Sequence, residues 1–339
     1  MTRVAIIGFG WWGRNIANSV LTSAKMKLAA IVEPTAGAAD AYAHNHGIAI
    51  LSWEQALASD DVDAVILTSP HRFHESQIIQ AAEAGKHVFC EKPLAFTLES
   101  AARAMAVCIR HGVVLGIGHE KRFEPAMVLI RRVIAKRELG VLLHIESNWS
   151  HDKFLALPPD NWRLAKSEAA VGPITATGIH LLDMAVCLCG QASQVYATNR
   201  SLATAFESGD TAASHVTFRT GVVAVVSAML ATPFYSRYTV FGSNGWIEVR
   251  DKAHVEAPAG WTVSRAGADG RVETMDIAPM NPVIVNLERF AAAAAARSQA
   301  DYEVPLQEML NTVAAFEALT RSAQSGQIES VPDVRVSDL

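Results

Sequence analysis

A short apolar run that leads directly into a glycine-rich turn constrains the fold of this chain more than any other feature. The run Val4–Ile7 has the composition of a buried strand, and three glycines follow it in the spacing G-x-G-x-x-G: Gly8, Gly10 and Gly13. Beyond the turn, apolar residues recur at helical spacing through residues 16–21. A strand, a tight glycine turn and a helix in this order predict the first unit of a Rossmann sheet.

Each glycine of this turn has its own physical reason in dinucleotide binding. Gly8 permits the tight turn, Gly10 lets a pyrophosphate approach the backbone, and Gly13 lets the helix pack closely on the strand. The N–H groups and the partial positive charge at the helix N-terminus favour phosphate binding. We therefore predict that the whole turn binds a dinucleotide: Gly8, Phe9, Gly10, Trp11, Trp12 and Gly13.

An acidic residue closes the second predicted strand, Leu28–Val32. Glu33 lies about as far after the glycine turn as the carboxylate that hydrogen-bonds the adenosine ribose hydroxyls and repels a 2′-phosphate. Pro34 and Thr35 follow it, and no arginine follows immediately. This pattern favours NAD over NADP as the cofactor.

Strand and helix patterns alternate up to about residue 120. Ser52–Gln55 has the form of a capping box at the start of one of the helices. Continuous apolar strands that alternate with helices are typical of a parallel sheet covered on both faces. We predict an α/β protein whose first domain, residues 1–121, is a doubly wound Rossmann domain that binds NAD(P). Further strands are predicted at Ala64–Leu67, Val88–Cys90 and Val113–Ile117.

The pattern changes in the second domain, predicted over residues 122–339. Residues 194–249 indicate successive strands, and Asn244-Gly245 between two of them is a hairpin signal. The strands indicate a mostly antiparallel, open-faced sheet with helices on one face. Helices are predicted at Ile179–Cys189, Val283–Arg297 and Leu306–Ser325.

Composition excludes several classes of function. The 339 residues are 50% hydrophobic and 19% charged, which is typical of a packed globular protein, and the formal net charge is −5. A chain without a basic stripe is a poor partner for nucleic acid, and no apolar stretch reaches membrane-spanning length. The four cysteines form no C-x-x-C pair, and no basic and apolar leader precedes the first strand. We expect a cytoplasmic protein with neither a nucleic-acid nor a membrane partner.

Two polar segments directly follow predicted strands, at the carboxyl ends where α/β sheets bind ligands. One reads Thr68-Ser69-Pro70-His71-Arg72-Phe73-His74, and the other reads Glu91-Lys92-Pro93. With the glycine turn, and with Gly118–Phe123 and Gly178–Asp183, they closely resemble the Gfo/Idh/MocA oxidoreductase family. Its members carry G-x-G-x-x-G, T-P-x-x-x-H and E-K-P in this order; here the second motif reads S-P-H-R-F-H.

The resemblance covers essentially the whole chain and implies a two-domain NAD(P)-dependent oxidoreductase, with the nicotinamide in a cleft against the face of the C-terminal sheet. Such enzymes transfer hydride between nicotinamide and a carbinol or carbonyl carbon of a small polar substrate: a sugar, polyol, cis-dihydrodiol or derivative. Many associate through the exposed sheet, so we expect a homodimer or homotetramer. Together with the glycine turn and Glu33, the residues implied to bind the cofactor are Thr68, Ser69, Pro70, His71, His74, Glu91 and Lys92.

The resemblance also implies two catalytic residues. Lys92 corresponds to the lysine that contacts the nicotinamide ribose and the substrate hydroxyl, and His180 corresponds to the histidine that acts as acid and base. Their chemistry suits the task, because removing a hydroxyl proton requires a group with a pKa near the working pH, which histidine has. A lysine stabilises a developing alkoxide as a cation, or acts as a base when burial lowers its pKa.

One position departs from the family pattern D-x-G-x-H. Ala176 stands four residues before His180, where the family commonly has aspartate. Thr175 or Thr177 would supply a hydroxyl there but no charge. Two interpretations stay open: Lys92 and His180 suffice, or another group replaces the missing carboxylate. The candidates for that group are His119, His151 and Asp152.

Several residues are candidates for holding the substrate. An arginine fork suits carboxylate, phosphate or polyhydroxyl groups, and a tryptophan suits stacking on a ring. No metal site is predicted, because His151 and Asp152 are adjacent and no third ligand is evident. Two alternative functions are an NAD-dependent glycoside hydrolase of the same family and a non-catalytic NAD(H)-binding regulatory protein. The predicted substrate-binding residues are Arg122, Trp162, Arg163 and Thr177.

Overall fold

The computed structural model describes every residue of the chain, Met1–Leu339, and the chain forms two compact units. The first unit contains Met1–His119, Val283–Leu310 and Arg335–Leu339, and the second contains Glu120–Pro282 and Asn311–Val334. None of the helices combines the length and the apolar character that crossing a bilayer requires.

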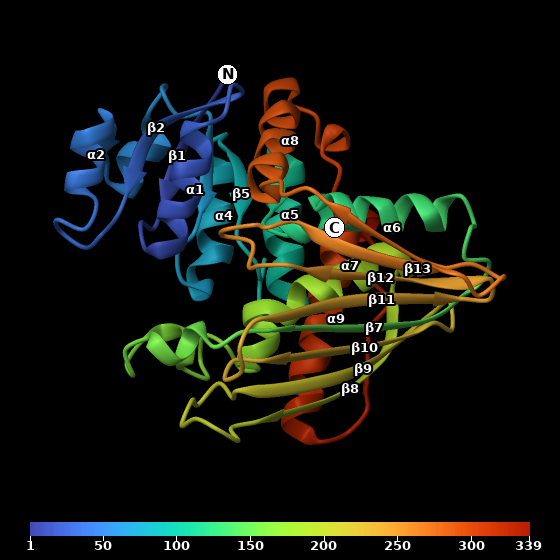
Figure 1. Cartoon of the computed structure of the whole chain (residues 1–339). Coiled ribbons are helices and arrows are strands. Elements are labelled where there is room, and N and C mark those ends of the chain that lie inside the picture. Colours follow the sequence, from blue (N-terminus) through green and yellow to red (C-terminus); the bar gives the residue numbers. More distant parts are fainter. The chain divides into compact units, whose positions relative to one another are not determined.

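The first unit is built on a six-stranded sheet. Its strands are β1 (Thr2–Ile7), β2 (Met26–Val32), β3 (Ala49–Ile50), β4 (Ala64–Leu67), β5 (His87–Cys90) and β6 (Leu115–Ile117). They are all parallel and follow the order β3-β2-β1-β4-β5-β6 (Figure 1). This order reverses between β1 and β4, the position in a doubly wound sheet where ligands bind. The predicted Rossmann sheet is confirmed.

The helices of this sheet are α1 (Trp11–Leu21), α2 (Asp40–His46), α3 (Trp53–Ala58), α4 (His74–Glu83) and α5 (Leu98–His111), with the short turn η1 (His71–Phe73) before α4. Their ends follow the local sequence. The Ser52 hydroxyl accepts from the Gln55 amide and the Gln55 side chain accepts from the Ser52 amide, so the predicted capping box is confirmed. Gly47 and Gly112 end α2 and α5 in the left-handed conformation.

A segment near the C-terminus belongs to the first unit: α8 (Pro282–Ala296), η6 (Gln299–Asp301) and, after a return of the chain, η7 (Val336–Asp338). It covers the open edge of β6. The Gln299 side chain pairs with both backbone groups of Leu115, at 2.8 and 3.1 Å, and the Tyr302 hydroxyl lies 3.2 Å from the backbone groups of Ile117. The sequence analysis assigned this segment to the second domain because it follows that domain in the chain. These contacts join residues about 185 positions apart and leave no local pattern.

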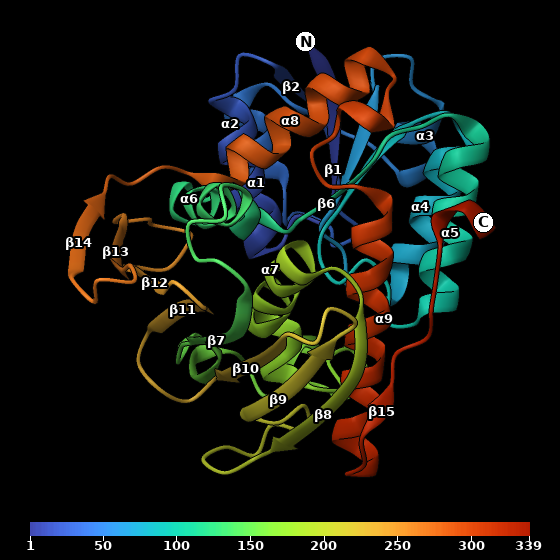
Figure 2. The same ribbon diagram turned by 90° about the vertical axis from the view of Figure 1, so that its right-hand side faces the viewer.

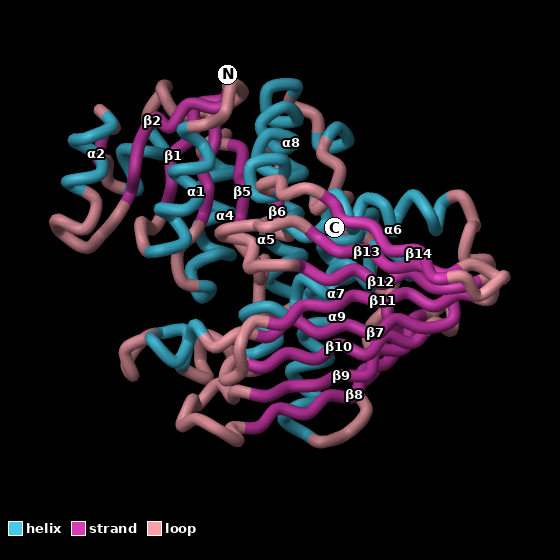
Figure 3. The backbone as a smooth tube through the Cα atoms, viewed as in Figure 1, coloured by secondary structure: helices cyan, strands magenta, loops and turns pink.

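The second unit contains a nine-stranded sheet, visible as the broad set of magenta strands in Figure 3. Its strands are β7 (Leu142–Ser150), β8 (Ala192–Arg200), β9 (Thr211–Phe218), β10 (Val223–Met229), β11 (Tyr235–Gly242), β12 (Gly245–Asp251), β13 (Trp261–Ala266), β14 (Val272–Ile277) and β15 (Glu329–Ser330). They follow the order β14-β13-β12-β11-β7-β10-β9-β8-β15, and only β7 and β10 pair in parallel. The predicted mostly antiparallel sheet is confirmed.

The hairpin predicted at Asn244-Gly245 joins β11 to β12, with Gly242 paired to Gly245. Gly245 has φ +144°, and a Cβ atom there would lie 2.0 Å from the carbonyl oxygen of Ala266. Only glycine fits both this backbone conformation and the close approach of the next strand.

The helical elements of the second unit are η2 (Glu120–Phe123), α6 (Pro125–Ala135), η3 (Lys153–Ala156), η4 (Trp162–Leu164), the π-turn η5 (Ile174–Gly178), α7 (Ile179–Cys189) and most of α9 (Leu306–Ser325). Helices α6, α7 and α9 lie on one side of the sheet (Figure 2). The opposite face carries no helix of this unit.

Candidate active site

The glycine turn of the first unit joins β1 to α1 and lies against the end of β4. Gly8 has φ +89°, and a Cβ atom there would lie 3.0 Å from the amide nitrogen of Ser69. At Gly13 a Cβ atom would lie only 2.2 Å from the carbonyl oxygen of Gly8. The Thr68 hydroxyl donates to the carbonyl oxygens of Ile7 (3.0 Å) and Gly8 (2.5 Å). The end of β4 therefore holds the turn in place.

Gly10 differs from the other two glycines, because open space surrounds the place that its side chain would occupy. A Cβ atom there would have no heavy atom within 4 Å. Gly10 is the N-cap residue of α1, and no side chain caps this helix. The rings of Trp11 and Trp12 lie 5.4 Å apart in its first turn. An N-terminus without a side-chain cap, next to open space, has the geometry that a phosphate group requires.

Glu33 is connected directly to the glycine turn. Its Oε2 accepts from the amide of Phe9 (2.6 Å), and its Oε1 accepts from the amide of Thr35 (2.9 Å). A carboxylate has about four lone-pair positions, so these two bonds leave acceptor capacity for ribose hydroxyls. Arg14 lies nearby, with its guanidinium donating to the carbonyl oxygens of Phe9 (3.4 Å) and Ala38 (2.6 Å).

His74 lies at the same edge of the sheet as the glycine turn. It is fully buried, with Nδ1 2.8 Å from the carbonyl oxygen of Pro93 and Nε2 3.1 Å from that of Ser69. The ring therefore ties the segment after β4 to the segment after β5. His71 lies next to Pro70 in the same loop, and its ring packs edge-to-face on Phe96 at 5.7 Å.

The Glu91-Lys92-Pro93 segment begins where β5 ends. Glu91 is buried, and a Cβ atom on Gly118 would lie 2.6 Å from its carboxylate. Gly118 is thus the residue that makes room for this carboxylate at the end of the neighbouring strand. Lys92 follows it and is half-buried.

In the second unit, Arg122 forms a buried ion pair with Asp183 of α7. Its Nε lies 2.5 Å from Oδ2 and its Nη2 lies 2.7 Å from Oδ1, the paired geometry of an arginine fork on a carboxylate. Thr312 of α9 adds a hydrogen bond to Oδ1 at 3.1 Å. The sequence analysis predicted that Arg122 holds substrate, but in the structure its fork is engaged by Asp183. Removing one partner of such a pair costs about 3–5 kcal/mol.

His180 lies one turn before Asp183 on the same helix. It is buried, and its Nε2 lies 3.6 Å from Oε1 of Glu120, which is buried as well. The ring of Trp149 packs beside it, with the ring centroids 5.3 Å apart. Glu120 lies in the motif Gly118–Phe123, three residues after the end of β6, and was assigned no role from the sequence. No local pattern marks it, because its partner comes from α7.

Lys121 stands between Glu120 and Arg122 in the chain, and it holds η2 to the sheet. Its Nζ lies 3.0 Å from Glu124 and 2.8 Å from Asp251, and it sits over the Trp149 ring at 4.9 Å. Burial opposes the charged lysine, but the two carboxylates outweigh it and raise the pKa of Lys121. Burial, reinforced by the charge of Asp251, raises the pKa of Glu124. Lys121 is therefore a structural cation.

The segment around Ala176 forms the π-turn that enters α7. Such turns are frequent at functional sites. The Thr177 hydroxyl donates to the carbonyl oxygens of Trp149 (2.7 Å) and Pro173 (3.2 Å), and the Thr175 hydroxyl donates to that of Val171 (3.0 Å). Both hydroxyls therefore bond to the backbone.

The other predicted candidates are spread over the two units. The guanidinium of Arg163 stacks on the ring of Trp162 at 4.2 Å, on η4. His151 is buried after β7, with its ring 5.6 Å from that of His254, and the next residue, Asp152, is exposed. His119 is the last residue of the first part of unit 1.

Comparison with known families decides where the chain belongs. Residues 2–119 match the model of an oxidoreductase family with an NAD-binding Rossmann fold, and residues 127–248 match the GFO/IDH/MocA C-terminal domain. A 1,5-anhydro-D-fructose reductase of Ensifer adhaerens is 31% identical over 87% of each chain. The chain belongs to the GFO/IDH/MocA oxidoreductase family.

Two further similarities span nearly the whole chain. A D-xylose 1-dehydrogenase (NADP(+)) of Haloferax volcanii is 28% identical over 95% of this chain and 97% of its own length. The solved structure of a levoglucosan dehydrogenase with NADH and L-sorbose has the same fold, with a TM-score of 0.85 and 21% identity over 98% of this chain and 99% of that one.

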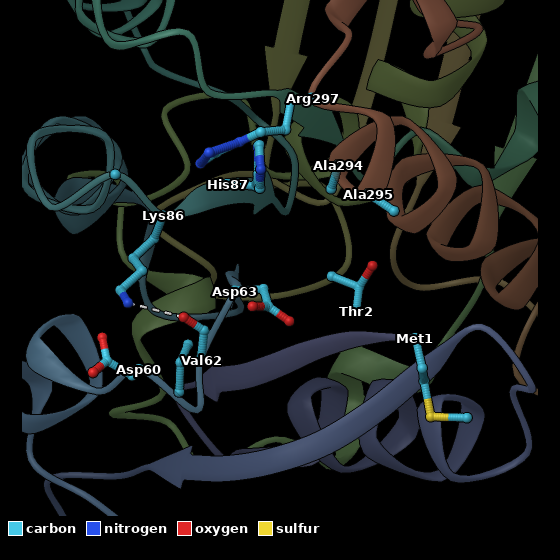
Figure 4. Close-up of a pocket in the computed structure, with 11 residues that line it drawn as sticks. Met1, Thr2, Asp60, Val62, Asp63, Lys86, His87, Ala294, Ala295 and Arg297 are labelled. Carbon is cyan, nitrogen blue, oxygen red and sulfur yellow. Dashed lines mark hydrogen bonds between the residues drawn. The ribbon is translucent and has the colours of Figure 1, made fainter.

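A pocket of about 410 Å³ lies at the other edge of the Rossmann sheet, where β1 and β5 begin (Figure 4). Its polar groups are largely bonded to the protein. Lys86 donates to the carbonyl oxygens of Ser59 and Val62, at 2.7 and 2.9 Å, and Asp63 is held by Arg3 at 2.7 Å. This pocket is separate from the edge with the glycine turn, and we give it no role in cofactor binding.

The glycine turn yields a prediction that separates folding from binding. Gly10→Ala should leave the melting temperature unchanged, because the added methyl group meets no protein atom, but it should weaken NAD(H) binding at least about tenfold. Gly13→Ala should instead lower the free energy of unfolding by about 1–3 kcal/mol, because its methyl group collides with the turn. Calorimetric titration with NADH and thermal melting measure the two effects. Unchanged NADH affinity in Gly10→Ala would show that no dinucleotide approaches this residue.

Proposed function

We propose that this GFO/IDH/MocA family member is an NAD(P)-dependent dehydrogenase or reductase that acts on a carbinol or carbonyl group of a sugar, polyol or related small polar compound. The family is one of oxidoreductases, and the relatives described above act on sugars or sugar derivatives by name. The observation that carries the proposal is the glycine turn. It combines a close-packed Gly8 and Gly13 with open space at Gly10, before a helix that no side chain caps.

The residues present fit a nicotinamide dinucleotide. The amide groups at the start of α1 would hold the pyrophosphate, and Glu33 would accept from the ribose hydroxyls. The bound cofactor would supply or accept a hydride. Lys92 would bind the substrate oxygen and stabilise negative charge on it, because a nearby cation lowers the energy of an alkoxide. His180 would take the hydroxyl proton during oxidation and return it during reduction.

For the cofactor we propose a preference for NAD over NADP. Glu33 is fixed by two backbone amides next to the turn, so its negative charge cannot easily move away from a 2′-phosphate. Arg14, in the first turn of α1, is engaged with two backbone carbonyl groups. A 2′-phosphate could pair with Arg14 only by displacing these carbonyl groups.

We also propose that the protein is a homo-oligomer, a dimer or a tetramer, formed through the helix-free face of the large sheet. Residues of β10 alternate between buried and half-buried, so one set of side chains faces away from the helices. This set includes Val225, which lies opposite His215 on β9 and Glu146 on β7. Tyr196, the register partner of His215, is exposed on β8. This mixed surface of valine, tyrosine, histidine and glutamate side chains has the apolar and polar character of many protein–protein interfaces.

Removing either proposed catalytic side chain should slow turnover strongly while the cofactor still binds. For Lys92→Ala and His180→Ala we expect kcat to fall by about a hundredfold or more, with less than a tenfold change in NADH affinity for His180→Ala. The assay follows reduced-cofactor absorbance with NAD or NADP and a panel of aldoses, polyols, aldonates and cis-dihydrodiols. A matched control is His46→Ala on α2. If both variants oxidise the best substrate at the wild-type rate, the proposed roles are wrong.

The cofactor preference depends on the charge of Glu33. In Glu33→Gln the shape and the bond from the Phe9 amide are kept, but the repulsion of a 2′-phosphate is lost. The ratio of the NADPH to NADH dissociation constants should therefore fall at least about tenfold, equivalent to about 1.4 kcal/mol. Fluorescence titration measures both constants, with Glu54→Gln on α3 as the control. An unchanged ratio would exclude Glu33 as the discriminating residue.

The oligomer proposal predicts the effect of a charge in the middle of the sheet face. Val225→Arg should dissociate the assembly into folded monomers, because a larger, charged side chain would have to be desolvated in the middle of the contact surface. Val272→Arg, on the exposed edge strand β14, should leave the assembly intact. Light scattering coupled to size-exclusion chromatography measures the mass. A wild-type protein that is monomeric at micromolar concentration would overturn the proposal.

A further inference from the structure

The carboxylate missing at position 176 has a counterpart elsewhere in the same unit. Ala176 leaves no acidic side chain one turn before His180, on the helical path into α7. Glu120 brings a buried carboxylate to within 3.6 Å of His180 Nε2 from a different element, η2. Asp183, the other carboxylate near His180 on α7, is neutralised by Arg122. Glu120 therefore places a buried carboxylate beside this imidazole.

We propose that Glu120 is the positioning residue of His180: it orients the imidazole, selects its tautomer and stabilises its protonated form, as a substitute for a carboxylate at position 176. The inference rests on the proposed role of His180 as acid and base. It assigns to Glu120 a role that does not require contact with the substrate.

The tautomer follows from which nitrogen faces the carboxylate. A negative charge beside Nε2 favours the form with a proton on that nitrogen, which leaves the basic lone pair on Nδ1. During oxidation the imidazole would take the hydroxyl proton of the substrate, and a bound nicotinamide would accept the hydride from the same carbinol carbon. The resulting imidazolium then faces an ionised carboxylate. The distance of 3.6 Å is that of an ion pair, longer than a hydrogen bond, and contacts of this kind often tighten when substrate binds.

The surroundings explain why Glu120 stays in place. Glu120 is the first residue of the short turn η2. Ion pairs hold the next two side chains: Lys121 pairs with Glu124 and Asp251, and Arg122 pairs with Asp183. Asp183 and His180 both lie on α7, so η2 contacts this helix twice: through Arg122 and through Glu120. A movement of η2 as a whole away from α7 would have to break the buried Arg122–Asp183 ion pair.

Other charged and titratable groups surround the imidazole. Lys121 and His254 both pack on the Trp149 ring that lies against His180, and His151 lies next to His254. Lys121 Nζ lies 4.9 Å from the centroid of the Trp149 ring, and the ring of His254 lies 5.7 Å from it. Replacing Glu120 by glutamine alters none of them directly. The substitution therefore isolates the effect of one negative charge.

The decisive experiment is a nuclear magnetic resonance titration of the full chain labelled on histidine, with the His180 resonance assigned from its absence in His180→Gln. In Glu120→Gln the pKa of His180 should fall by about one unit or more, because a neighbouring carboxylate stabilises the imidazolium. Glu120→Asp, which keeps the charge, should retain most of the wild-type pKa. Glu273→Gln, an exposed glutamate of β14, should leave it unchanged.

Turnover provides the second readout. With a substrate found in the panel, Glu120→Gln should lower kcat by about tenfold to a hundredfold with KM little changed, and the acidic limb of the kcat/KM profile should move to lower pH. Adding Ala176→Asp to Glu120→Gln should restore the pKa of His180 and part of the turnover. If the double variant matches Glu120→Gln in both, the equivalence of the two positions is refuted.

The outcomes separate this inference from the proposed function. If the pKa of His180 is the same in the wild type and in folded Glu120→Gln, Glu120 has no such role, whatever the activity. If the pKa moves as expected but His180→Ala retains full turnover, the pair exists and the role of His180 in catalysis is wrong. Circular dichroism confirms that each variant is folded, and Glu120→Asp provides the test if the glutamine variant is not.

Discussion

Burying ionised side chains is the constraint on which the second unit depends. Glu120, Lys121 and Arg122 are consecutive and all buried, and taking such charges out of water costs several kcal/mol each unless opposite charges meet them. Lys121 meets the carboxylates of Glu124, the residue before α6, and of Asp251 in β12, and Arg122 meets that of Asp183 in α7. Asp251 and Asp183 lie far from η2 in the sequence, so these ion pairs require η2, α7 and the sheet to be in one arrangement. The same requirement places a carboxylate beside His180.

The first unit depends on steric constraints instead. Its glycine turn packs so closely on itself and on β4 that two of its three glycines have no room for a side chain, while the third faces open space. Glu33 and Thr68 then hold the turn from either side, through a backbone amide and two backbone carbonyl groups. A rigid turn with bonded neighbours and one open position is preorganised for a phosphate, because no group must move before the ligand binds.

Features with a local cause could be predicted from the sequence. The parallel strands are continuous apolar runs, the capping box at Ser52 is a four-residue pattern, and the hairpin at Asn244-Gly245 needs a glycine in its turn. Features that depend on residues far away in the chain could not be predicted in this way. The packing of α8 with the first unit rests on contacts with β6, and the pairing of Arg122 with Asp183 joins residues 61 positions apart. Arginine was therefore interpreted as a substrate ligand, since no local pattern shows its partner. Glu120 was overlooked for the same reason.

The absence of an acidic residue at position 176 has a different meaning in the structure than in the sequence. In the sequence it suggested a lost catalytic group and, with it, a protein that only binds nucleotide. An imidazole responds to the electrostatic potential at its nitrogen atoms and not to the position in the chain from which a carboxylate comes. A glutamate on η2 at 3.6 Å can therefore replace an aspartate on the helix itself, provided that η2 is fixed. The two ion pairs that fix η2 thus connect the stability of the second unit to the chemistry proposed for His180.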